Sequence, residues 1–169
     1  MADIYPTEYR IDVELPVTDD FIVGAVNSTV GMGVRTVHTI TRGVRVAKFT
    51  GQLSRAITQH TLQLTPDTHL HDPHFVGLLT HSCAPNCVLD MQQLEIVSLA
   101  DIAAGELLTI DYAVTEDVLH RQFACGCGAS HCRRWITGRR EAPSAAGQLF
   151  LQTLADQRVQ PMASAGMRR

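Results

Sequence analysis

The sequence predicts a mostly β fold of short strands and small sheets, with one short helix near the C-terminus. Three observations favour this class. Brief runs of β-branched and apolar residues follow one another closely, turn-forming residues separate them, and good helix formers gather at residues 145–159. The chain has 169 residues, of which 45% are hydrophobic, so it suits one globular domain with an ordinary core.

The N-terminal half is expected to hold several strands. Residues 21–26, FIVGAV, form a short apolar run that is typical of a buried strand. Residues 31–52 contain two β-branched stretches on either side of residues 41–43, Thr-Arg-Gly, and this pattern predicts a hairpin. Residues 60–64, HTLQL, lie among turn signals and predict one more strand.

The C-terminal half predicts two strands and a helix. Apolar residues at 94–97 and 107–112 lie on either side of a break at residues 101–105, so we expect one strand before the break and one after it. Residues 145–159, AAGQLFLQTLADQRV, are good helix formers with a broken apolar stripe. We expect a short helix there, followed by a flexible, frayed tail.

The charge and hydropathy of the chain exclude some classes of function. A net charge of −3 argues against a protein whose main role is wrapping nucleic acid. The sequence has no apolar run of about 18 residues and no signal-peptide layout at its start, so we predict no membrane insertion and a cytoplasmic location, or a nuclear one if the source is eukaryotic. One local exception is a group of arginines, which is either a basic docking patch or a plain solvated face: Arg133, Arg134, Arg139 and Arg140.

Five cysteines in a chain without a secretory signal are better interpreted as metal ligands or free thiols than as disulfides. The segment CGCGASHC places Cys125, Cys127 and Cys132 within eight residues, with glycines that let the backbone fold around a metal. A closed structural zinc site needs a fourth ligand. From the residues alone the candidates are Cys83, Cys87 and His131.

Two further segments are weak signals alone: Thr80 to Cys87, THSCAPNC, and Gly105 to Tyr112, GELLTIDY. With Gly31-Met32-Gly33 before them and the cysteines after them, they resemble the SET-domain family in order and content. The family motif Asn-His-Ser-Cys-x-Pro-Asn is matched from His81 to Asn86. Gly-Glu-Glu-Leu-Thr-x-Asp-Tyr is matched with Leu107 in place of its second Glu. The resemblance extends from about Gly31 to Trp135.

The resemblance implies an enzyme that transfers a methyl group from S-adenosylmethionine (SAM) to lysine side chains of a protein or peptide. It also implies a threaded pseudoknot, which brings residues 80–86 beside residues 110–112. Tyr112 takes the place of the catalytic tyrosine, and Trp135 that of an aromatic residue which packs on the cofactor's adenine. The other implied cofactor-binding residues are Gly31, Met32, Gly33, Thr80 and His81. The implied zinc ligands are Cys83, Cys125, Cys127 and Cys132, which leaves Cys87 outside the site.

On this interpretation residues 1–120 are the SET domain, residues 121–140 a zinc-binding post-SET segment, and residues 141–169 the helix and tail. The chain departs from the family pattern at Thr80, where asparagine is usual, and at Phe49, where many members have a tyrosine. The stretch between residues 51 and 80 is also short.

These departures leave two other functions open: methylation of a small amine or free amino acid, and a catalytically silent interaction module. Ile110 lacks the hydroxyl that restricts product multiplicity in some members, and this predicts di- and trimethyl products.

Overall fold

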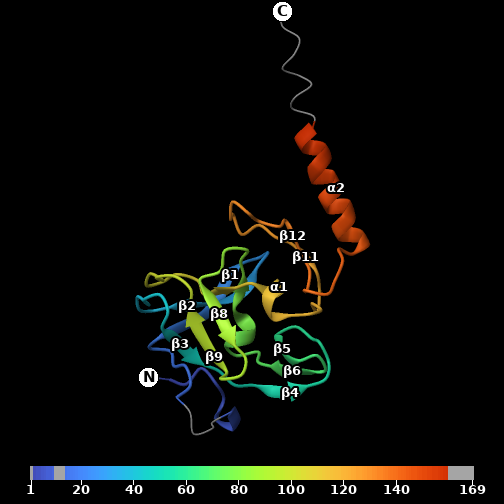
Figure 1. Ribbon diagram of the computed structural model, residues 1–169. Helices are drawn as coiled ribbons and strands as arrows, with labels where there is room; N and C mark the ends of the chain where they lie inside the picture. Colours follow the sequence, from blue (N-terminus) through green and yellow to red (C-terminus); the bar gives the residue numbers. More distant parts are fainter. Residues whose placement is uncertain (1, 10–13, 160–169) are drawn as a thin grey trace, which may run out of the picture.

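The computed structural model describes residues 2–9 and 14–159, and it builds this part of the chain mainly from short strands (Figure 1). The strands are β1 (Phe21–Asn27), β2 (Gly31–Thr36), β3 (Arg45–Lys48), β4 (Gln52–Ser54), β5 (Thr61–Thr65), β6 (Thr68–His71), β7 (Thr80–His81), β8 (Cys87–Asp90), β9 (Glu95–Ser98), β10 (Thr109–Ile110), β11 (Phe123–Ala124) and β12 (Trp135–Ile136). The helices are η1 (Thr7–Tyr9), η2 (Val76–Leu78), α1 (Tyr112–Thr115) and α2 (Ala145–Val159). The mostly β class and the C-terminal helix are therefore confirmed.

The hairpin predicted within residues 31–52 is wrong. β2 pairs antiparallel with β1, and the Asn27 side chain accepts hydrogen bonds from the backbone N–H groups of Thr29 and Val30 in the turn between them. β3 instead pairs with β9, about fifty residues later. Residues 41–43 do form a turn, but Gly43 donates its N–H to the carbonyl of Ser98. A local turn signal fixes a change of direction, whereas long-range packing selects the partner strand.

Two three-stranded sheets carry most of the other strands, in the orders β3-β9-β8 and β4-β6-β5. The strands expected at residues 60–64 and 94–97 correspond to β5 and β9. The strand expected at residues 107–112 is shorter than predicted, because only Thr109 and Ile110 are in β10 and α1 begins at Tyr112.

The main core consists of apolar side chains from β1, β2, β5, β6, β8, β9 and β10 and from the segments between strands. Phe49, Phe75, Ile96 and Leu108 are each at most 1% exposed. Burial of side chains of this size contributes about 1.5–3 kcal/mol each, so this cluster stabilises the fold substantially. Ile110 belongs to the same cluster and is 2% exposed.

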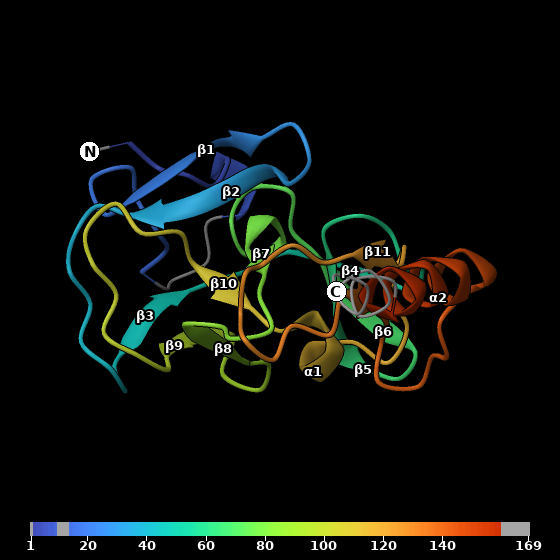
Figure 2. The ribbon, with the colours of Figure 1, turned by 90° about the horizontal axis from the view of Figure 1, so that it is seen from above.

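β7 and β10 pair in parallel near the centre of the molecule, although about thirty residues separate them (Figure 2). Thr109 lies opposite Thr80, and Ile110 lies opposite His81. The pairing continues past the strands, since Ser82 donates its N–H to the carbonyl of Ile110 at 3.0 Å. The expectation that residues 80–86 lie beside residues 110–112 is confirmed.

α2 follows the small β11–β12 sheet and extends away from the rest of the fold (Figure 1). The tail expected after it, residues 160–169, lies outside the described residues. Within the described part of the chain, no helix has both the length and the apolar content needed to cross a membrane.

Candidate functional site

Tyr112 stands at the start of α1, directly after β10. The side chain of Asp111 caps this helix by accepting a hydrogen bond from the N–H of Ala113. The Tyr112 hydroxyl donates to the backbone carbonyl of Leu79 at 2.6 Å. Burial, and then the nearby Glu116 carboxyl, raise the pKa of Tyr112 to about 12. Its hydroxyl is therefore protonated at neutral pH.

His81 connects Tyr112 to the neighbouring segments. Its Nδ1 accepts the backbone N–H of Tyr112 at 3.3 Å, and its ring lies 5.3 Å from the Tyr112 ring. Burial lowers the pKa of His81 to about 4, so the imidazole is neutral at physiological pH. Because Nδ1 is an acceptor, this geometry assigns the ring proton to Nε2, which lies 3.5 Å from Cys83 Sγ.

The Gly-x-Gly segment lies in β2, next to the strand that carries His81. A Cβ added at Gly33 would lie 2.6 Å from a methyl group of Val26 and 3.2 Å from the methyl group of Thr80. Glycine at this position thus permits the close approach of β2 to β7. Gly31 has a φ of +82°, which favours glycine, and Met32 is 46% exposed. The structure therefore places Gly33 of this segment next to Thr80.

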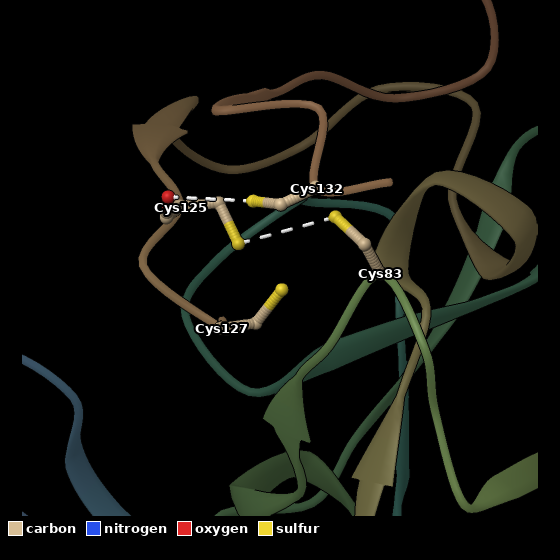
Figure 3. A group of neighbouring side chains, drawn as sticks. All are labelled: Cys83, Cys125, Cys127 and Cys132. Carbon is tan, nitrogen blue, oxygen red and sulfur yellow. Dashed lines mark hydrogen bonds between the residues drawn. The ribbon is translucent and has the colours of Figure 1, made fainter. Parts of the chain in front are cut away.

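Four cysteines form a compact sulfur cluster, three from the segment after β11 and one from the loop after β7 (Figure 3). The Sγ atoms of Cys83, Cys125, Cys127 and Cys132 all lie within 4.8 Å of one another, and those of Cys83 and Cys125 are 4.0 Å apart. Four thiolates at a Zn–S distance of about 2.3 Å in a tetrahedron would be separated by roughly 3.8 Å. The donor set and its spacing therefore fit a closed tetrahedral site.

The two other candidate ligands are not part of the sulfur cluster. Cys87 is in β8, 1% exposed, and burial raises the pKa of its thiol to about 12. His131 Nε2 makes a hydrogen bond with the backbone carbonyl of Cys83 at 2.7 Å.

Within the cluster, burial raises the pKa of Cys125. Burial also acts to raise the pKa of Cys127, but hydrogen bonds from the backbone N–H groups of Cys83 and Ala129, together with those from the Cys125 and Cys132 side chains, outweigh it and lower the pKa to about 6.

Comparison with known proteins agrees with this geometry. The model of the SET domain family matches residues 31–113. This chain belongs to the SET-domain family. Histone-lysine N-methyltransferase 2D from Homo sapiens is 38% identical over 64 residues, which are 34% of this chain and 1% of that protein. Histone-lysine N-methyltransferase ASHR3 from Arabidopsis thaliana is 35% identical over 72 residues, which are 39% of this chain and 14% of that protein.

Solved structures share the fold. The structure of KRYPTONITE in complex with mCHG DNA and SAH is 26% identical with a TM-score of 0.55, and the match covers 68% of this chain and 28% of that one. The methyltransferase domain of human histone-lysine N-methyltransferase SETMAR is 21% identical with a TM-score of 0.54, covering 70% and 58%. This SET-domain chain spans only a small part of the length of the two curated relatives named above, 1% and 14%.

Trp135 of this SET-domain protein packs against α2. Its ring lies 5.5 Å from that of Phe150, and its Nε1 donates to the side-chain oxygen of Gln122 at 3.0 Å. A Cβ added at Gly147 would lie 2.3–2.8 Å from three atoms of the indole. The lack of a side chain at Gly147 thus lets α2 lie directly on the tryptophan.

The arginine group is largely paired within the chain. The Arg133 guanidinium contacts Asp111, while Arg139 and Arg140 both contact Asp117. These carboxylates offset much of the local positive charge, so the group is less basic than its sequence indicates.

Sequence reasoning missed two residues beside the SET-domain site. The Phe123 ring lies 5.6 Å from His81 and 6.0 Å from Tyr112. Glu116 is 7% exposed, and its carboxylate accepts the backbone N–H of Gln63 in β5. Burial raises the pKa of Glu116 to about 7. Neither belongs to a recognisable motif, and the only signal was their position within 15 residues of Tyr112.

An open groove of about 560 Å³ lies between β5 and the segment after β12. Its lining residues are Gln63, Leu64, Thr65, Pro66, Asp117, Arg139 and Arg140.

Proposed function

We propose that this SET domain transfers a methyl group from SAM to the side-chain amine of a lysine in a protein or peptide substrate. The observation that carries the proposal is the pairing of β7 with β10, which places a half-buried, protonated Tyr112 hydroxyl on the carbonyl of Leu79. The curated relatives are histone-lysine methyltransferases, and one related structure holds an H3(1-15) peptide together with SAH.

The substrate amine must first lose a proton, because a lysine with an ordinary pKa of about 10.4 is an ammonium ion at neutral pH. Buried apolar surroundings disfavour the charged form and lower this pKa. Tyr112 is a poor general base in this setting, since its hydroxyl is already protonated and donates to Leu79. We assign it a positioning role, in which its oxygen and nearby carbonyls orient the amine.

We assign the cofactor to the surface where β2 meets β7. SAM, when bound, supplies the methyl group. The residues that would hold it are Gly31, Met32, Gly33, Thr80 and His81. Two of these residues, Gly33 and Thr80, are neighbours in the fold. Trp135, which is half-buried, would pack on the adenine. Replacement of Trp135 by alanine should then weaken SAM binding in calorimetry. The loss of affinity should exceed that in Gly147→Ala, which disturbs the packing of α2 on Trp135 but keeps the indole.

We further propose that Cys83, Cys125, Cys127 and Cys132 hold one structural zinc ion. The four sulfurs match the spacing of a tetrahedral thiolate site, and three of them lie in a segment with little regular secondary structure of its own. A metal there would stabilise residues 121–140 as a post-SET segment that follows a SET domain at residues 1–120. Residues 141–169 would form a third, C-terminal part.

A peptide is favoured over a small amine as the substrate because the curated relatives are histone-lysine methyltransferases and a related structure holds an H3(1-15) peptide. The short stretch between residues 51 and 80 still forms the whole β4-β6-β5 sheet. Phe49, which stands where many members have a tyrosine, is 1% exposed within the core. We place the reaction in the cytoplasm, and propose no role for a membrane or for nucleic acid.

The test is to incubate the protein with labelled SAM and three substrates: lysine-containing peptides, free lysine, and a lysate of its own organism. Mass spectrometry then identifies the labelled species. Label on lysine side chains of proteins or peptides supports the proposal. Label on free amines alone would favour a small-molecule methyltransferase. SAM binding without transfer to any substrate would favour a silent module.

A further inference from the structure

Arg133 joins the sulfur cluster to the segment that carries Tyr112. It directly follows Cys132 in the chain, and its backbone N–H points at Cys83 Sγ at 3.5 Å. Its guanidinium reaches Asp111 with an N–O distance of 2.5 Å. One residue therefore touches the cluster with its backbone and the residue before Tyr112 with its side chain.

Asp111, which contacts Arg133, is also the residue that caps α1. The same Oδ1 atom that contacts Arg133 accepts the N–H of Ala113 at 3.1 Å. The backbone carbonyl of Asp111 accepts the N–H groups of Val114 and Thr115. The Asp111 side chain is only 14% exposed, so a change in its rotamer would disturb the first turn of this four-residue helix.

His81 forms a second connection between Cys83 and Tyr112. Its Nε2 lies 3.5 Å from Cys83 Sγ, and its Nδ1 accepts the Tyr112 N–H. Tyr112 is thus held from two directions, through His81 and through Asp111, and both connections end at Cys83. Only the connection through Arg133 includes a fully charged pair, and hydrogen bonding to Asp111 is the main cause that raises the pKa of Arg133.

We propose that Arg133 is a positioning residue that couples the state of the sulfur cluster to the orientation of Tyr112. When the four sulfurs hold a metal, residues 125–132 are fixed, Arg133 is fixed with them, and its guanidinium holds Asp111 in the rotamer that caps α1. When the cluster is empty, Arg133 loses its anchor and the start of α1 loosens. The kinetic part of this inference rests on the proposed methyltransferase function, whereas the structural part does not.

The structural part is tested by hydrogen exchange at the amides of residues 112–116. Arg133→Met keeps the length of the side chain and removes the charge. In zinc-loaded protein, with one zinc per chain verified by elemental analysis, Arg133→Met should raise exchange at these amides at least tenfold and leave residues 125–132 protected. Treating the wild type with a chelator should raise exchange at residues 112–116 by a similar factor, and should add little in the variant.

Arg134→Met is the matched control. Arg134 is the next residue and is exposed, and its side chain has no hydrogen bond or ion pair within the described residues. The Arg134→Met variant should show the same hydrogen exchange at residues 112–116 as the wild type. Equal exchange at residues 112–116 in zinc-loaded wild type and Arg133→Met would overturn the proposal. Loss of zinc from Arg133→Met would also overturn it, because Arg133 would then act on the metal site itself.

The kinetic part separates turnover from binding. Arg133→Met should lower kcat for peptide methylation about tenfold with the KM for SAM within twofold, and Arg133→Lys should restore most of the rate. The Asp111→Asn/Arg133→Met double variant should be no slower than the slower single variant, as expected for two residues that act together. Unchanged kcat, or equal rates for the Lys and Met variants, would overturn the positioning role. A wild type inactive on every amine would instead refute the proposed function and leave the exchange result standing.

Discussion

The hydroxyl of Tyr112 donates a 2.6 Å hydrogen bond to the backbone carbonyl of Leu79, across 33 positions of sequence. This bond fixes the phenol where β7 begins. Because the hydroxyl proton is used in this bond, the phenol oxygen can act only as a hydrogen-bond acceptor toward a reacting group. Tyr112→Phe should therefore keep SAM affinity and lower kcat at least roughly tenfold, about 1.4 kcal/mol in the barrier. Calorimetry and steady-state rates measure the two effects, and wild-type turnover in the variant would remove Tyr112 from the mechanism.

One zinc ion should bind per chain through the four clustered thiolates. Elemental analysis should give one zinc for wild type and a clear loss in the Cys83→Ser/Cys127→Ser variant, because a closed site that lacks two thiolates has too few ligands. Cys87→Ser is the control, since Cys87 is also a buried cysteine but lies in β8 outside the cluster. Full zinc content in the double variant, or none in the wild type, would rule out the assignment.

The contact between α2 and Trp135 can be monitored by tryptophan fluorescence, because Trp135 is the single tryptophan of the chain. Gly147→Ala would place a methyl group within 2.3–2.8 Å of the indole, so α2 must move away from the ring. We expect red-shifted tryptophan emission and a lower melting temperature. Gly24→Ala, whose added Cβ meets nothing within 4 Å, serves as the control. Identical emission from both variants would contradict the packing of α2 on Trp135.

Buried Glu116 should make stability depend on pH. Burial raises its pKa in the fold to about 7, so the folded chain keeps this proton over a range where the unfolded chain has released it. The free energy of unfolding should thus fall as pH rises from about 5 to 7. Glu116→Gln should remove this fall and exceed the wild type at pH 8 by up to about 3 kcal/mol, while the two agree at pH 5.

Urea unfolding at pH 5 and pH 8 measures the effect of Glu116→Gln. Exposed Glu8 provides the control, as Glu8→Gln should follow the wild type at both pH values. A Glu116→Gln curve parallel to the wild type across this range would show that the carboxyl is ionised throughout.

Ile110 should permit more than one methyl transfer. It is 2% exposed and has no hydroxyl to hold a water molecule near the amine. Di- and trimethylated lysine should therefore accumulate in a fully converted peptide, as measured by mass spectrometry. Ile110→Tyr should shift the product toward one methyl group, provided that its melting curve shows a folded protein. Product that stops at one methyl group in both proteins would show that Ile110 packs the core without controlling multiplicity.

Sequence patterns alone determined the elements that depend on near neighbours. The apolar run at residues 21–26, the strand after His60 and the helix at residues 145–159 are each formed by residues close in sequence, whose periodicity is visible without the fold. The three late cysteines were visible as a site for the same reason, because ligands within eight residues need no tertiary contact to be near each other. The family motifs then supplied Cys83 as the fourth sulfur.

Tertiary structure alone decided which distant segments meet. The turn at residues 41–43 predicted that its flanking strands would pair with each other, but β2 pairs with β1 and β3 with β9, because long-range packing outweighs a local turn preference. The same long-range packing places Phe123 beside His81, Glu116 on β5 and Trp135 under Gly147. It also places Arg133 between Cys83 and Asp111, a contact that follows from no spacing in the sequence, since its partners lie 50 and 22 residues away along the chain.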